Sequence, residues 1–97
     1  MTTSNHLITS VNVGIDVGKA QLDIHLHEPD LYCSVQNSSE GIARALKWLD
    51  QYPIKRIVIE ATGRYEQLFV EAALDQQLPV IVINPKRRSA EIGRAHV

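Results

Sequence analysis

The apolar residues change their spacing once along the chain, near Asn37. Before that point three runs have the pattern of β-strands, over residues 11–17, 21–27 and 31–35, and only short turns separate them. Such gaps favour antiparallel hairpins, because a crossover between parallel strands needs a dozen or more residues. The sequence therefore predicts a fold that opens with a three-stranded antiparallel meander.

After Asn37, helical stripes alternate with two further strand runs, over residues 56–60 and 78–83. The stripes are Ile42, Ala45, Leu46 and Leu49, and then Tyr65, Leu68, Phe69 and Ala72. We expect Asn37 or one of the two serines that follow it to cap the first helix, and Thr62 to cap the second. Strand–helix–strand units force parallel neighbours with right-handed crossovers. The predicted class is therefore α/β, with a mixed sheet.

Size and composition exclude several classes of protein. The chain has 97 residues and a net charge of −1, so any contact with nucleic acid must come from a local basic patch. The single cysteine, Cys33, cannot form an internal disulfide, and this predicts a reducing, cytoplasmic location. No apolar run approaches the roughly 20 residues that a membrane span needs, so we expect no membrane partner.

Two acidic residues stand out because each lies near the C-terminal end of an apolar strand. Asp16 lies near the end of the β-branched run at 11–17, which we expect to be buried on both faces, and Glu60 ends the run at 56–60. Open α/β sheets form their ligand crevice at such strand ends. If the two strands are parallel neighbours, about 4.8 Å apart, the carboxylates repel each other unless a cation such as Mg²⁺ or Mn²⁺ lies between them. A helix cap or a surface acid is the alternative interpretation.

Three other motifs are weaker. Residues 14–19 lack the long glycine loop of a phosphate-binding motif, and a hairpin rather than a helix follows them. His25, His27 and Cys33 are three metal-ligand types without a fourth, so we interpret them as solvated residues of a half-covered sheet. Asp23 shares the face of the histidines, and we interpret it in the same way.

A dense basic cluster at positions 86–88 is a candidate for binding a nucleic-acid backbone, although three consecutive cations are also common in solvated loops. Lys55, Arg56 and Arg64 could extend such a patch near Glu60. The expected nucleic-acid-binding set is Lys19, Arg64, Lys86, Arg87 and Arg88.

Several segments carry a resemblance to a known family. They include Gly14-Ile15-Asp16-Val17, Glu60-Ala61-Thr62-Gly63-Arg64-Tyr65 and Asn84-Pro85. In this order, between about residues 11 and 87, they resemble the N-terminal domain of insertion-sequence transposases of the one-ten family. The resemblance implies a ribonuclease H-like fold of the RuvC type, in the order strand-strand-strand-helix-strand-helix-strand, which we expect to be incomplete at its C-terminus.

The resemblance also implies a function, namely DNA transposition by a tetrad of acids, abbreviated DEDD, that binds Mg²⁺ or Mn²⁺. Asp16 matches the first acid and Glu60 the second, so both are expected catalytic and metal-binding residues. A separate domain supplies a serine nucleophile, and members work as homo-oligomers with an RNA encoded by the element. The third and fourth acids lie in an Asp-x-x-Asp motif beyond the Asn-Pro strand, whereas no aspartate follows Asp75 here. We therefore expect an N-terminal fragment that binds DNA and metal but is inactive alone.

The expected organisation has three parts: a polar leader at 1–10, the transposase domain at 11–88 and a non-native tail at 89–97. Residues 91–97 resemble the translation of a sequencing adaptor, which motivates the last boundary. Two alternative functions remain. One is a fragment of an actin-like or sugar-kinase-like ATPase, and the other is a non-catalytic remnant that associates with full-length transposase.

Overall fold

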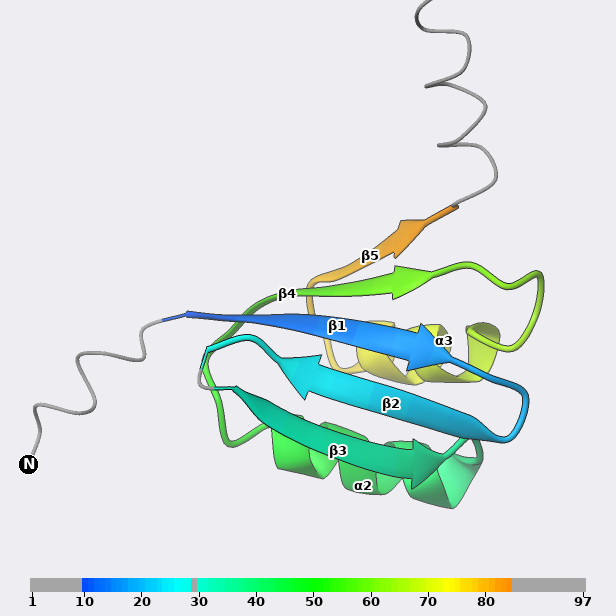
Figure 1. Ribbon diagram of the computed structural model, residues 1–97, viewed down its shortest axis with the longest axis horizontal. Coiled ribbons are helices and arrows are strands. Elements are labelled where there is room, and N and C mark those ends of the chain that lie inside the picture. The colour runs from blue at the N-terminus through cyan, green and yellow to red at the C-terminus, as the bar shows by residue number, and fades with distance from the viewer. Residues whose placement is uncertain (1–9, 29, 85–97) are drawn as a thin grey trace, which may run out of the picture.

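The structure, a computed structural model, describes residues 10–28 and 30–84. This part of the chain forms five strands and two helices (Figure 1). In chain order they are β1 (Val11–Val17), β2 (Gln21–Leu26), β3 (Leu31–Gln36), α2 (Ser39–Leu49), β4 (Ile54–Glu60), α3 (Gln67–Asp75) and β5 (Val80–Ile83). The predicted α/β class and element order are confirmed, and the strand bounds agree with the predicted ones to within two residues.

The strands form one mixed sheet in the order β3-β2-β1-β4-β5. The pairs β1–β2 and β2–β3 are antiparallel, as expected of an opening meander, whereas β1–β4 and β4–β5 are parallel. β1 is thus the central strand and pairs with one antiparallel and one parallel neighbour. This order is compatible with a ribonuclease H-like fold.

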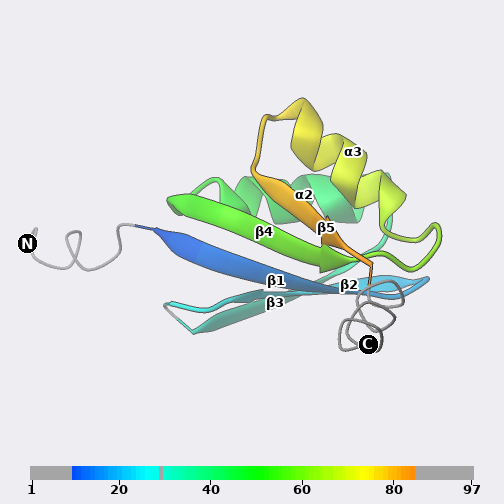
Figure 2. The ribbon, with the colours of Figure 1, turned by 90° about the horizontal axis from the view of Figure 1, so that it is seen from above.

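Both helices pack on the same face of the sheet, which we call the covered face (Figure 2). Alternate residues of β1, β2 and β4 point into the core there, and the four apolar residues predicted for the first helical stripe are buried against them. Phe69 is the largest fully buried side chain and comes from α3. None of the helices within the described ranges is long and apolar enough to cross a membrane.

The expectation that β1 is buried on both faces is wrong for the described part of the chain. Val11, Val13 and Ile15 are buried on the covered face, but Asn12 and Asp16 are exposed on the other. The reason is that α2 and α3 lie on one side of the sheet, so they shield only every second residue of each strand. We call the opposite side the open face.

The start of α2 depends on Ser38 and Gly41. The Ser38 hydroxyl caps the helix by accepting a hydrogen bond of 3.1 Å from the Gly41 N–H, so the cap is one of the three residues proposed from the sequence. A Cβ atom at Gly41 would lie 2.1 Å from the carbonyl oxygen of Gln36. Only glycine therefore allows the chain to turn this sharply from β3 into α2.

The start of α3 differs from its prediction. The helix begins at Gln67, and Thr62 stabilises a turn that precedes the helix instead of capping it. Tyr65 lies within that turn, and Leu68 lines a hollow between α3 and α2 together with Ile42 and Leu46, so the two residues stay 38% and 43% exposed. The buried stripe of α3 consists of Phe69 and Ala73.

Candidate functional site

Asp16 and Glu60 lie side by side on the open face. β1 and β4 run parallel with Ile15 paired to Ile59, which places the next residue of each strand, Asp16 and Glu60, at the same level of the sheet. Neighbouring strands are about 4.8 Å apart. Both residues are exposed and belong to the same face, since Ile15 and Ile59 point into the core. The structure thus brings the two predicted acids together.

A hollow of about 330 Å³ lies on the open face around these acids. It is lined by Gly14, Ile15, Asp16, Asp23, His25, His27, Tyr32, Val58 and Glu60. The lack of a side chain at Gly14 leaves room in the hollow, because a Cβ atom there would lie 3.3 Å from the Nε2 atom of His27. The hollow therefore combines carboxylates with imidazole and phenol rings.

Asp23 adds a third carboxylate to this hollow. It is paired directly with Asp16 across the antiparallel β1–β2 ladder. Its Oδ1 atom accepts hydrogen bonds from the Ser34 hydroxyl at 2.6 Å and from the Gln21 side-chain amide at 2.8 Å. These bonds, the one from Ser34 first, hold the pKa of Asp23 below its ordinary value. An ionised carboxylate is thus fixed next to Asp16.

The sequence interpretation of Asp23 as an ordinary solvated residue missed this placement. The available signal was the short connection between the first two strands. A tight hairpin pairs residues at nearly equal distances from its turn, and Asp16 and Asp23 are equally far from the midpoint of the turn.

The histidines and Cys33 do not form a common site. His25 and His27 lie on the open face, with ring centroids 4.6 Å apart, and the His25 Nε2 atom hydrogen-bonds to the Asp30 carboxylate. Cys33 is paired with the buried Ile24, so it faces the helices, and burial raises the pKa of its thiol. Within residues 10–28 and 30–84, no three His, Cys, Asp or Glu side chains are grouped so that they could hold a metal ion.

The acids nevertheless fit part of a metal site. Carboxylate oxygens are the donors that Mg²⁺ and Mn²⁺ prefer, and Asp16 and Glu60 present such oxygens from adjacent strands. Two carboxylates fill only part of a six-coordinate shell, so such an ion would keep water or take further ligands from elsewhere.

The loop that follows Glu60 is fixed by a small hydrogen-bonded box. The Glu66 carboxylate accepts bonds from the Thr62 backbone N–H at 2.9 Å and from the Thr62 hydroxyl at 2.8 Å. The Thr62 hydroxyl in turn accepts a bond from the Tyr65 N–H. The backbone bond from Thr62 is the main cause of a lowered pKa at Glu66. This arrangement resembles a capping box, although its acid stands one residue later than usual.

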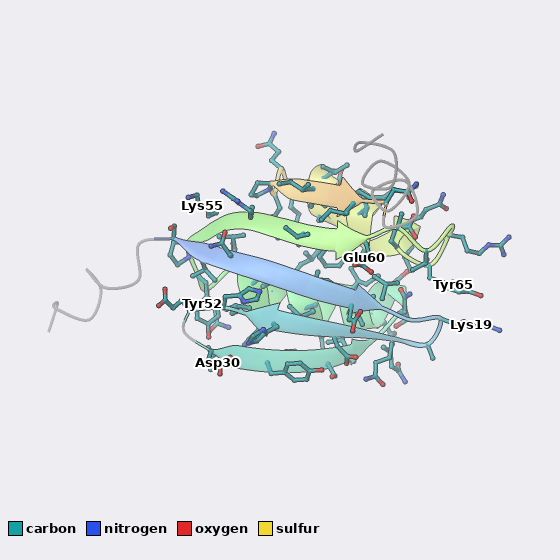
Figure 3. All side chains as sticks on the ribbon, turned by 45° about the horizontal axis from the view of Figure 1, so that its top comes forward. Lys19, Asp30, Tyr52, Lys55, Glu60 and Tyr65 are labelled. Atoms are coloured by element: carbon teal, nitrogen blue, oxygen red, sulfur yellow. The ribbon has the colours of Figure 1, made fainter. Side chains whose placement is uncertain are left out.

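Lys19 and Arg64 are exposed in the two loops that follow the acid-bearing strands. Lys19 lies in the β1–β2 turn and Arg64 in the β4–α3 loop. Figure 3 shows Lys19, Glu60 and Tyr65 at the same end of the sheet. Both cations thus lie in loops that follow the acid-bearing strands, and the remaining three members of the basic set, at 86–88, lie outside the described residues.

Lys55 and Arg56, considered from the sequence as an extension of the basic patch, do not lie near Glu60, and the patch itself, at 86–88, lies outside the described residues. Both residues belong to the beginning of β4, and Figure 3 shows Lys55 at the opposite end of the sheet from Glu60. A strand rises about 3.3 Å per residue, so Arg56 lies roughly 13 Å from Glu60 along β4.

Known families provide an independent comparison. A model of the DEDD transposases of IS110 insertion sequences, described as "Transposase", matches residues 13–95. The chain belongs to this transposase family. The match includes both strand-end acids, and it confirms the resemblance to the one-ten family. No curated protein matches the chain.

Membership in a DEDD transposase family implies interaction with DNA and dependence on a divalent metal. It favours the transposase interpretation over an ATPase, since the matched family is not one of ATPases. The domain bounds at 10/11 and 88/89, and the non-native origin of residues 89–97, stay predictions.

Proposed function

We propose that this chain takes part in the DNA transposition of an insertion sequence, and that Asp16 and Glu60 hold its divalent metal ion, Mg²⁺ or Mn²⁺. The observation that carries the proposal is the position of the two acids at the C-terminal ends of adjacent parallel strands, in one hollow. Strand ends of this kind form the ligand crevice of open α/β sheets.

The residues around the hollow support cation binding. Three carboxylates on neighbouring strands, those of Asp23, Asp16 and Glu60, give the hollow a negative potential that attracts cations and is relieved when one binds. A divalent ion there would stabilise the charge that develops on a phosphodiester during its cleavage or transfer.

Lys19 and Arg64 are proposed to contact the DNA backbone on either side of the acids, together with Lys86, Arg87 and Arg88. The supporting observation is that Lys19 and Arg64 lie on the two loops that follow the acid-bearing strands. Replacing both by glutamine should weaken binding to duplex DNA of any sequence. It should also reduce the slope of log Kobs against log salt by about 2. A Lys55→Gln and Arg56→Gln double variant, changed at the other end of β4, is the matched control.

The chain by itself is proposed to have little strand-transfer activity. Two carboxylates cannot complete a metal cage for this reaction. Four further features remain predictions. They are association with an element-encoded RNA, assembly into a homo-oligomer, cytoplasmic location, and the alternative role of a non-catalytic remnant that associates with full-length transposase.

The metal proposal is tested by thermal unfolding with and without Mn²⁺. At ten times its Kd, a ligand of the folded state adds about 1.4 kcal/mol of stability. For a domain of this size that corresponds to a rise in Tm of roughly 6 to 11 °C. We expect the rise in the unchanged protein and its loss in an Asp16→Asn, Glu60→Gln double variant.

The matched control carries Asp75→Asn and Glu71→Gln on α3, which removes the same two charges from another part of the surface. It should retain the full rise. Equal loss of the rise in both double variants, or stabilisation by ATP instead of Mn²⁺, would contradict the proposal.

A further inference from the structure

Asn37 stands at the junction of β3 and α2, and three of its hydrogen bonds reach into two other loops. Its backbone N–H donates to the Ala20 carbonyl at 2.9 Å. Its side-chain Nδ2 atom donates to the Gly18 carbonyl and to the Tyr65 carbonyl, also at 2.9 Å each. The last two partners are 19 and 28 residues away in the sequence, so one amide group joins three separate parts of the chain.

The two loops that Asn37 joins are those that follow the acid-bearing strands. Gly18 comes two residues after Asp16, in the turn between β1 and β2. Tyr65 comes five residues after Glu60, in the loop between β4 and α3 that the Thr62 and Glu66 box stabilises. The Asn37 amide therefore connects the chain just beyond one acid with the chain just beyond the other.

We call these two side-chain hydrogen bonds the Asn37 bridge, and the identity of their acceptors shows which atom of the amide donates them. Both acceptors are carbonyl oxygens, so only an NH₂ group, with its two hydrogens, can donate to both. The Oδ1 atom of Asn37 is buried and has no hydrogen-bond partner in the described part of the chain. A buried acceptor without a partner is unfavourable and calls for a reason. The two bonds that Nδ2 donates explain why an asparagine stands here despite its unpaired Oδ1 atom. Aspartate, serine and alanine cannot donate two bonds from this position.

Asn37 is not needed as the helix cap, because Ser38 caps α2. We propose that Asn37 is a positioning residue, which locks the β1–β2 turn to the β4–α3 loop and thereby fixes Asp16 and Glu60 relative to each other. Its consequence for metal binding rests on the function proposed above. Lys19 and Arg64 lie next to the two bonded carbonyl groups, so the same bridge fixes the spacing of these two cations.

The bridge is tested first without metal, by amide hydrogen exchange in the 97-residue chain. Asn37→Asp keeps the shape of the side chain but removes both donated bonds, and Asn37→Ser removes them without adding charge. We expect exchange to become about tenfold faster or more in both loops together, over residues 18–21 and 62–66, relative to the core strands. Ser38→Ala is the control and should accelerate exchange in the first turn of α2 only. Faster exchange in one loop alone, or an equal increase at every amide, would overturn the bridge.

The role in positioning is tested by Mn²⁺ affinity, measured by electron paramagnetic resonance of the free ion at a temperature where every variant is folded. Loss of residues that orient metal ligands typically weakens metal binding 10- to 100-fold, so we expect at least about a tenfold increase in Kd for Asn37→Ser. Ser38→Ala should bind as the unchanged protein does. Unchanged affinity in Asn37→Ser would overturn the positioning role. If the unchanged protein itself binds no Mn²⁺, the proposed function fails, and the exchange experiment alone then decides whether Asn37 joins the loops.

Discussion

The two faces of the sheet are built from alternate residues of the same strands, yet they have opposite properties. On the covered face, Val13, Ile15 and Ile59 are at most 5% exposed. On the open face, their neighbours Asp16 and Glu60 are exposed and charged. The difference shows that alternate residues of one strand can have different roles, because those on one face pack in the core and those on the other form the candidate site. Substitutions on the covered face should therefore change folding, and those on the open face should change cation binding.

The largest expected effect comes from adjacent residues of β4 that face opposite sides. Ile59→Ala removes a fully buried side chain and should lower the free energy of unfolding by about 2–5 kcal/mol. Val58→Ala, on the half-buried open face, should cost about 1 kcal/mol or less. Urea unfolding of the two variants measures the difference, and similar losses would refute the distinction between the faces.

Two glycines, Gly41 in the first turn of α2 and Gly14 in β1 beside the open-face hollow, offer a sharper comparison. Gly41→Ala places a Cβ atom 2.1 Å from a backbone carbonyl oxygen, which cannot move without shifting β3, so it should cost about 1–3 kcal/mol. Gly14→Ala places its Cβ atom 3.3 Å from the tip of the His27 side chain, which can rotate away. We expect the Gly14 variant to unfold within about 0.5 kcal/mol of the unchanged protein. A Gly14 variant as unstable as the Gly41 variant would show that the open face is as closely packed as the core.

Removing an acid from the open face should stabilise the metal-free protein. Asp16 lies between Asp23 and Glu60 on neighbouring strands, and like charges that face each other in a sheet are destabilising. Asp16→Asn is expected to raise the free energy of unfolding by about 0.2–1 kcal/mol in the presence of a chelator. Asp75→Asn on α3 should leave it unchanged. A clear destabilisation by Asp16→Asn would mean that this carboxylate has a structural role.

The smallest effect concerns pH. The Thr62 hydrogen bonds lower the pKa of Glu66 in the folded state, so the carboxylate stabilises the fold above its ordinary pKa of about 4.3. That contribution is lost as the pH falls through the lower, folded-state pKa. A Glu66→Gln variant should therefore show a weaker loss of Tm between about pH 5 and pH 3 than the unchanged protein. Parallel Tm curves for the two proteins would contradict this linkage.

Much of the fold could be predicted because periodicity and connection length are properties of the chain itself. The short gaps before Asn37 indicated the antiparallel pairs, and the helices after it indicated the parallel ones. The position of Asp16 and Glu60 near the ends of apolar runs predicted that they meet only if their strands are parallel neighbours, and the β1–β4 pairing meets that condition. The open face of β1 was not predicted, because the run at 11–17 is almost wholly apolar and whether helices cover one side of a sheet or both depends on packing.

The remaining features of the site depend on contacts between distant residues. Asn37 was expected to be a cap candidate, and nothing in its local sequence indicates that its amide joins two loops. Cys33 was considered together with His25 because both lie on neighbouring strands, and only the β2–β3 register places them on opposite faces. Lys55 is close to Glu60 in sequence, but the extended conformation of β4 separates them.

The most direct test of the central claim is to locate bound Mn²⁺ by paramagnetic broadening of amide NMR signals. If Asp16 and Glu60 hold the ion, substoichiometric Mn²⁺ should first broaden the amides around them, at the C-terminal ends of β1 and β4, and leave those of α3 sharp. The Asp16→Asn, Glu60→Gln double variant should show no such local broadening at the same Mn²⁺ concentration. Broadening centred on another part of the surface, or unchanged in the double variant, would contradict the assignment of these two carboxylates as the metal ligands.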